Sequence, residues 1–98
     1  MSEERLKLIF ADYEMDFIHP RNLCKSRAEF EKMCYSIWAV NELLNYMIAN
    51  KTLDPIVSIR QFAAKVKGYA SMNPNSRKMF TVAKEVTEDI LDMFLAMQ

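Results

Sequence analysis

The chain of 98 residues contains one glycine and three prolines, the two residue types that most often interrupt regular structure. Tight β-hairpins favour glycine in the turn, and no Asn-Gly or Asp-Gly pair occurs here. Loops that bind phosphate groups need several glycines close together. The scarcity of glycine therefore argues against an all-β fold and against a glycine-rich nucleotide-binding loop.

Residues that bind metals or act as nucleophiles are also scarce, because the chain has one histidine and two cysteines. A tetrahedral zinc site needs four close ligands, and a di-iron bundle needs two Glu-x-x-His pairs, which are absent. Asp12, Asp16 and His19 share one side of a helix, but polar residues are ordinary on the outer face of an amphipathic helix. We expect no metal, no cofactor and no catalytic activity, and we expect Cys34 to pack inertly within a helix.

Four acidic residues near the carboxyl end invite comparison with catalytic carboxylates: Glu85, Glu88, Asp89 and Asp92. Catalytic pairs depend on a cleft that separates their pKa values. These residues lie opposite the apolar stripe of their helix, where water surrounds them. We therefore interpret them as a solvated face.

No stretch of the sequence approaches the ~20 consecutive apolar residues that a membrane-spanning helix needs. The first ten residues, MSEERLKLIF, lack the basic start and long apolar run of a signal peptide. Two cysteines without a secretion signal favour free thiols. We expect a cytoplasmic protein that makes no membrane contact.

Thirteen basic residues balance thirteen acidic residues, so the overall charge gives no general attraction to nucleic acid or membranes. The charge is uneven along the chain: residues 1–20 sum to about −3, residues 51–78 to about +5 and residues 79–98 to about −3. The hydrophobic fraction of 51% is at or above the upper end for soluble domains. Because a small domain buries such a fraction with difficulty, we expect part of it to lie on a contact surface.

Apolar residues recur at helical spacing in four segments, which predict helices over residues 3–18, 27–50, 55–71 and 74–97. Each segment follows residues that favour a helix start: Ser2; the capping box of Ser26 and Glu29; Asp54-Pro55; and Asn73-Pro74. The link between the last two helices is short, so they should be antiparallel neighbours or form a sharp corner. The fold prediction is an all-α four-helix bundle in a single domain, residues 1–98.

The helix predicted over residues 27–50 carries apolar residues on two opposite faces. One stripe consists of Phe30, Met33, Ile37, Val40, Leu44, Met47 and Ile48. The opposite side carries Tyr35, Ala39, Glu42 and Tyr46, with Trp38 and Leu43 on its flanks. Two interpretations remain open: the helix is central and packs on both sides within one chain, or its second face binds a partner.

In the next helix Phe62, Lys65 and Tyr69 also share a face, and Phe62 is expected to belong to the core.

The function that these patterns favour is non-catalytic protein binding, with a regulatory or accessory role and a homodimer as the expected form. Aromatic residues with a polar group are enriched at protein interfaces. The expected partner-binding residues are Tyr35, Trp38, Leu43 and Tyr46.

Nucleic-acid binding is the alternative function. Basic residues surround the third helix and the start of the fourth: Arg60, Lys65, Lys67, Arg77 and Lys78. Two helices joined by a short turn permit a degenerate helix-turn-helix, although Lys67 occupies a position where that motif prefers an apolar residue. An apolar ligand held between the helices is a third possibility.

Overall fold

Ser2 begins the first helix by accepting a hydrogen bond from the Arg5 amide at 3.3 Å. In the computed structural model, α1 spans Glu3–Tyr13 and leads directly into η1, a π-helical segment at Glu14–Ile18. The structure describes residues 1–19, 25–73 and 76–98. The predicted extent of the first helix, 3–18, is therefore confirmed. Its π-helical end is a finding of the structure, and such segments often occur at functional sites.

The second helix, α3, spans Arg27–Ala49 and begins at the predicted cap. Ser26 Oγ accepts a hydrogen bond from the Glu29 amide at 3.2 Å. The Glu29 carboxylate accepts a hydrogen bond from the Lys25 amide at 2.9 Å, one residue before the amide that a capping box uses. Asp54 caps the following helix through its own side chain, also as predicted.

The third helix, α4, spans Pro55–Met72 and ends at Asn73, whose side-chain amide donates a hydrogen bond to the Tyr69 carbonyl at 3.1 Å. The prediction that Asn73 caps the start of the next helix is wrong, because Asn73 closes α4. The last helix, α5, spans Arg77–Ala96. Its predicted start at residue 74 lies outside the described residues.

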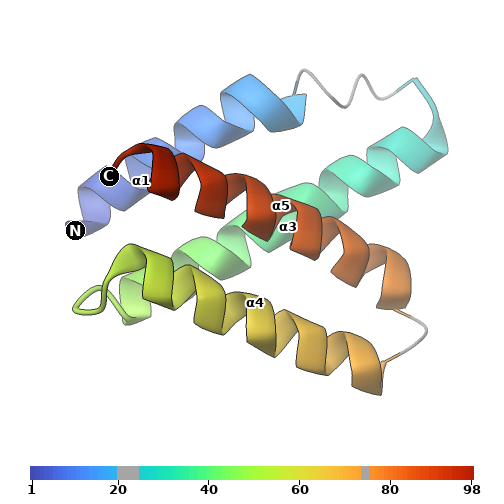
Figure 1. Cartoon of the computed structure of the whole chain (residues 1–98). Helices are drawn as coiled ribbons and strands as arrows, with labels where there is room; N and C mark the ends of the chain where they lie inside the picture. Colours follow the sequence, from blue (N-terminus) through green and yellow to red (C-terminus); the bar gives the residue numbers. More distant parts are fainter. Residues whose placement is uncertain (20–24, 74–75) are drawn as a thin grey trace.

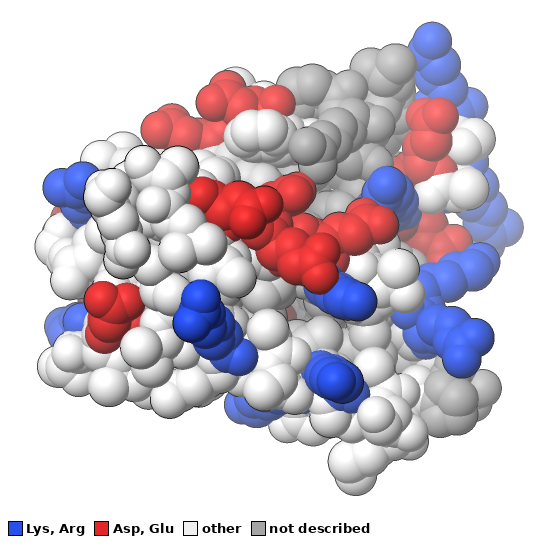
Figure 2. Space-filling model, viewed as in Figure 1, with Lys and Arg blue, Asp and Glu red and all other residues white. Residues whose placement is uncertain are grey.

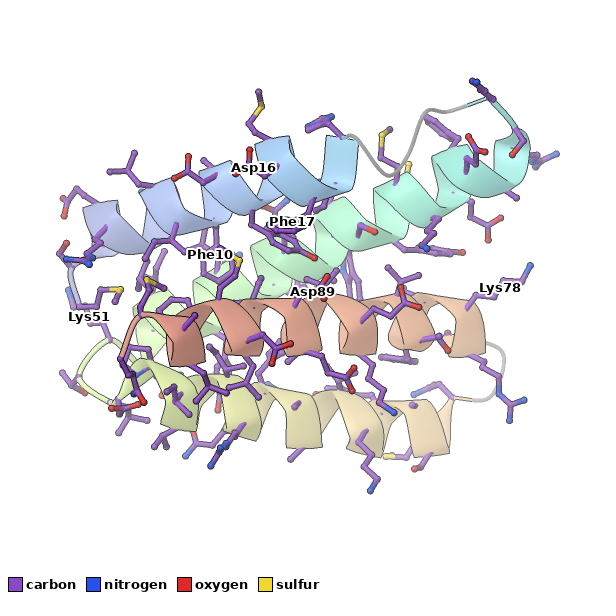
Figure 3. The ribbon with its side chains drawn as sticks, turned by 45° about the horizontal axis from the view of Figure 1, so that its top comes forward. Phe10, Asp16, Phe17, Lys51, Lys78 and Asp89 are labelled. Atoms are coloured by element: carbon purple, nitrogen blue, oxygen red, sulfur yellow. The ribbon has the colours of Figure 1, made fainter. Side chains whose placement is uncertain are left out.

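The helices form an all-α four-helix bundle, and the described residues contain no β-strand. α3 contacts α1, η1, α4 and α5, so it is the central helix (Figure 1). α4 and α5 pack side by side and run in opposite directions, as Figures 1 and 3 both show. The bundle measures 39 × 31 × 20 Å, a flattened shape that leaves α4 at one edge.

All four helices contribute side chains to one hydrophobic core. Figure 3 shows Phe10 and Phe17 directed from the first helix toward α5. The buried apolar residues are Leu6, Phe10, Tyr13, Ile18, Ala39, Val40, Leu43, Met47, Ile59, Phe62, Val66, Val82, Ala83, Val86, Ile90 and Phe94. The buried apolar residues of α5 recur at helical spacing: Val82, Ala83, Val86, Ile90 and Phe94.

The buried face of α3 differs from the predicted stripe. Ala39 and Leu43 are 0% exposed, whereas Phe30, which was predicted to be in the stripe, is 55% exposed. Cys34 is also exposed, so the prediction that it packs inertly is wrong. The physical reason is that α3 packs against helices on several sides, which turns residues from both predicted faces into core.

The described helices include none that is long and apolar enough to cross a membrane.

Candidate functional site

A groove of about 400 Å³ lies where α3, α4 and α5 meet. Five aromatic side chains line it: Trp38 and Tyr46 from α3, Phe62 and Tyr69 from α4, and Phe80 from α5. Glu42 and Lys65 also line it and supply one charge of each sign. We call this feature the aromatic groove. Three helices must pack together before these residues become neighbours.

Contacts between the rings fix the walls of the aromatic groove. The Tyr46 and Phe62 rings lie 5.7 Å apart between centroids and are tilted by 55°, and the Tyr69 and Phe80 rings lie 6.5 Å apart and are stacked. Such ring pairs contribute about 0.5–1.5 kcal/mol each beyond the burial of area. The Lys65 ammonium lies 5.6 Å from the Tyr46 ring centroid, within the range of a cation–π contact. The packing of these rings therefore forms the groove within a single chain, without a partner.

Exposure rises from the floor of the aromatic groove to its rim. Phe62 is buried, Trp38, Tyr46 and Phe80 are half-buried, and Tyr69 is 47% exposed. The Tyr46 hydroxyl donates a hydrogen bond to Gln61 Oε1 at 3.1 Å near the surface. A surface that combines half-buried rings with polar groups at the edge has the composition of a protein-binding site.

The charged residues of the groove come from two helices, Glu42 from α3 and Lys65 from α4. Both are exposed. Within residues 1–19, 25–73 and 76–98, neither side chain forms an ion pair. Each charge is therefore available to a group of opposite sign on another molecule.

The structure brings together two of the four residues that the sequence predicted as partner contacts, Trp38 and Tyr46. Leu43 is a correction: its side chain is 0% exposed and belongs to the core, because α3 packs on that side too. Tyr35 does not line the aromatic groove. Its hydroxyl donates a hydrogen bond to Glu31 Oε1 at 2.9 Å, and this bond raises the pKa of Tyr35 above its ordinary value.

The predicted basic residues do not line a single groove. Lys65 lines the aromatic groove, whereas Lys67 and Arg77 line a different groove between α4 and α5. Arg60 and Lys78 line neither groove, and Figure 3 shows Lys78 directed away from the bundle.

The two helices of a helix-turn-helix cross at about 90–120°. α4 and α5 instead run side by side in opposite directions, so they lack that geometry.

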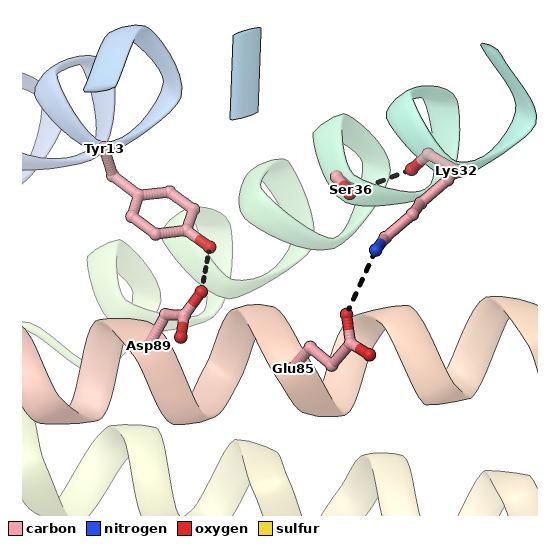
Figure 4. Close-up of polar contacts among 5 residues, drawn as sticks. All are labelled: Tyr13, Lys32, Ser36, Glu85 and Asp89. Carbon is pink, nitrogen blue, oxygen red and sulfur yellow. Dashed lines mark hydrogen bonds and ion pairs between the residues drawn. The ribbon is translucent and has the colours of Figure 1, made fainter. Parts of the chain in front are cut away.

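The acidic residues of α5 form a band on one face of the molecule (Figure 2). Glu85, Glu88 and Asp92 are exposed, and Glu85 forms a solvent-exposed ion pair with Lys32 at 3.8 Å. Asp89 is half-buried and accepts a hydrogen bond from the Tyr13 hydroxyl (Figure 4). The band is thus a solvated face with two residues, Glu85 and Asp89, that contact other helices.

No group of three or more His, Cys, Asp or Glu side chains within the described ranges is close enough to hold a metal ion. Asp12, Asp16 and His19, which share one side of the first helix, lie within these ranges and form no such group. Cys24 lies outside the described residues.

Three aromatic residues of the aromatic groove were not among the predicted partner contacts: Phe62, Tyr69 and Phe80. A partial signal existed, because Phe62, Lys65 and Tyr69 share one face of α4 by helical spacing. Phe80 gave no signal of this kind. Its place in the groove depends on how α5 packs against α4, which spacing along one helix does not specify.

Comparison with known proteins gives no further assignment, since no family model, curated protein or solved structure matches this chain.

Proposed function

We propose that this protein is a non-catalytic protein-binding module of the cytoplasm, and that it self-associates through the aromatic groove. The observation that carries the proposal is the convergence of five aromatic side chains from three helices on one open groove. Aromatic side chains commonly dominate the energy of protein interfaces because they bury a large area at a small entropic cost.

A second copy of the chain suits the groove because of its charges. A two-fold symmetric interface brings the same patch of both subunits together, so the patch must be complementary to itself. Glu42 and Lys65 line the groove from two different helices. A copy rotated by half a turn then presents Lys65 to Glu42 and Glu42 to Lys65. The rings between them supply the apolar centre of the interface.

Nucleic-acid binding has less support from the geometry. The basic residues do not line a single groove, and α4 and α5 lack the crossing of a helix-turn-helix. The aromatic groove carries one basic and one acidic side chain, which is a poor match for a phosphate backbone.

Sedimentation equilibrium over a wide range of concentrations tests the proposal. The wild-type chain should form dimers, and Trp38→Ala should weaken the dimer by about 2 kcal/mol or more if Trp38 is central. Because Trp38 also packs against the core, Tyr69→Ala provides a second variant at a more exposed position. It should weaken association and, through the lost stacking on Phe80, lower the free energy of unfolding by no more than about 1.5 kcal/mol.

Phe30→Ala is the matched control. Phe30 is an exposed aromatic residue on the same helix as Trp38, and it does not line the groove. Its removal should leave the dimer intact. A wild-type chain that stays monomeric at the highest concentration would refute self-association, as would an equal loss of dimer in Phe30→Ala and Tyr69→Ala.

A further inference from the structure

A second groove, of about 720 Å³, runs between α4 and α5. We call it the α4–α5 groove. Its apolar part includes Ala63 and Ala70 from α4 and Leu91 from α5. The alanine side chains are short, so the backbone of another chain can approach α4 closely. The groove uses a different face of α4 from the aromatic groove, although Val66 and Phe80 line both.

Three cationic side chains line the α4–α5 groove: Lys67 from α4, and Arg77 and Lys84 from α5. All three are exposed, and none forms an ion pair with another described residue. Glu88 is the acidic side chain of the lining. The groove therefore carries excess positive charge beside an apolar surface, and a ligand with acidic groups next to apolar groups would match both features.

We propose that the α4–α5 groove binds an acidic amphipathic α-helix of a protein partner. The apolar stripe of such a helix would lie on the alanine-lined part of α4. Acidic residues beside the stripe would face Lys67, Arg77 and Lys84. This is the helix-in-groove mode of recognition, in which residues spaced three and four apart anchor one face of the incoming helix.

The shape of the groove favours a helix over a small molecule. The groove is open to solvent along its side, so a ligand in it keeps one face in water. An amphipathic helix needs such a wet face, whereas small-molecule sites bury most of the ligand surface. The phosphate groups of a nucleic acid could pair with the cationic side chains of the groove. A nucleic acid has no apolar stripe, however, that would cover the alanine and leucine side chains.

Fluorescence anisotropy with a synthetic peptide tests the proposal on the full chain. The probe is a labelled helical peptide of about five turns with leucines on one face and glutamates beside them. A peptide of the same composition, scrambled so that the leucine stripe is lost, serves as the probe control. The amphipathic peptide should bind at least about tenfold more tightly than the scrambled one.

Variants of the groove then locate the binding. Lys67→Glu combined with Lys84→Glu should weaken peptide binding by about tenfold or more, because two attractions become repulsions. Ala63→Phe should weaken it by filling the apolar part of the groove. Lys78→Glu is the matched charge control, since Lys78 is an exposed lysine of α5 that does not line the groove. It should change binding less than about twofold.

The outcomes separate this proposal from self-association. The Lys67 and Lys84 variants should leave the sedimentation of the dimer unchanged. Equal binding of the two peptides would overturn the proposal, and so would binding that the groove variants do not reduce. Retention of duplex DNA that depends on Lys67 and Lys84, without peptide binding, would also overturn it and assign the groove to nucleic acid.

Discussion

The Tyr13 hydroxyl donates a hydrogen bond to Asp89 Oδ2 at 2.9 Å and so joins the first helix to the last across 76 residues of sequence (Figure 4). The Tyr13 side chain is 2% exposed, and its ring stacks on Phe17 with 5.3 Å between centroids. Asp89 belongs to the acidic band of α5, whose other members are exposed. One carboxylate of a solvated face thus bonds to a buried side chain, whereas the contact of its neighbour Glu85 with Lys32 is a solvent-exposed ion pair.

Tyr13→Phe should lower the free energy of unfolding by about 1 kcal/mol. The substitution keeps the ring and its packing but removes the hydroxyl, which leaves Asp89 without this donor in a half-buried position. Urea denaturation followed by circular dichroism measures the change. Tyr35→Phe is the control, because the hydroxyl of Tyr35 bonds within one turn of α3 and joins no two helices. Equal effects of the two substitutions would contradict a structural role for the Tyr13–Asp89 bond.

Leu43→Ala should destabilise the protein by about 2–5 kcal/mol, the usual range for a leucine truncated in a packed core. Leu43 is 0% exposed, so the substitution leaves a cavity beneath α3. Leu95→Ala on α5, where the leucine is 42% exposed, should lose less than about 1 kcal/mol in the same urea titration. If Leu43→Ala instead unfolded at nearly the wild-type urea concentration but formed fewer dimers, Leu43 would be an interface residue after all.

Ser58→Ala should leave stability unchanged or raise it by up to about 1 kcal/mol. Ser58 is 1% exposed, and its hydroxyl has no hydrogen-bond partner among the described residues. Burial of an unsatisfied hydroxyl is unfavourable, so its removal relieves a penalty. Ser36→Ala is the matched control, because the buried Ser36 hydroxyl donates to the Lys32 carbonyl at 2.8 Å. Thermal unfolding compares the two, and a loss above about 1 kcal/mol in Ser58→Ala would show that its hydroxyl is satisfied.

Glu31→Ala should lower the pKa of Tyr35 toward its ordinary value of about 10. The hydrogen bond to Glu31 is the main cause of the raised pKa, and burial adds to it. A raised pKa favours the neutral phenol in the folded state. The small stabilisation that the raised pKa of Tyr35 gives the folded state is therefore present below pH 10. It is lost as the pH rises through the pKa of Tyr35 in the folded protein. An NMR titration of the Tyr35 ring carbons measures the pKa, and an unchanged value in Glu31→Ala would contradict this cause.

Local signals in the sequence were sufficient for the helices. Ser2, Ser26 and Asp54 cap the helices that they were predicted to cap, since a cap depends on residues within one turn. Asn73 was misassigned because an Asn-Pro pair is compatible both with the end of one helix and with the start of the next. The π-helical end of the first helix has no comparable local signature.

The site was only partly predictable, because it depends on how the helices pack. Helical spacing placed Trp38, Tyr46 and Leu43 off the main stripe, but it could not tell which of them α4 and α5 would cover. Leu43 became core, while Trp38 and Tyr46 became walls of a groove. Phe80 joined them from a helix more than thirty residues away in sequence, a contact that only tertiary packing creates.

A charge exchange between Glu42 and Lys65 tests the central claim, self-association through the aromatic groove, most directly. Glu42→Lys and Lys65→Glu should each weaken the dimer, because the rotated copy then meets a like charge. Equimolar mixing of the two variants should restore dimers, because one variant carries lysine at both positions and the other carries glutamate at both. A mixed dimer therefore places lysine opposite glutamate at both contacts of the two-fold interface. The double variant Glu42→Lys with Lys65→Glu, in which both pairs are opposite again, should therefore recover the wild-type dimer in sedimentation equilibrium. A double variant no better associated than either single variant, or single variants that dimerise like the wild type, would contradict the account.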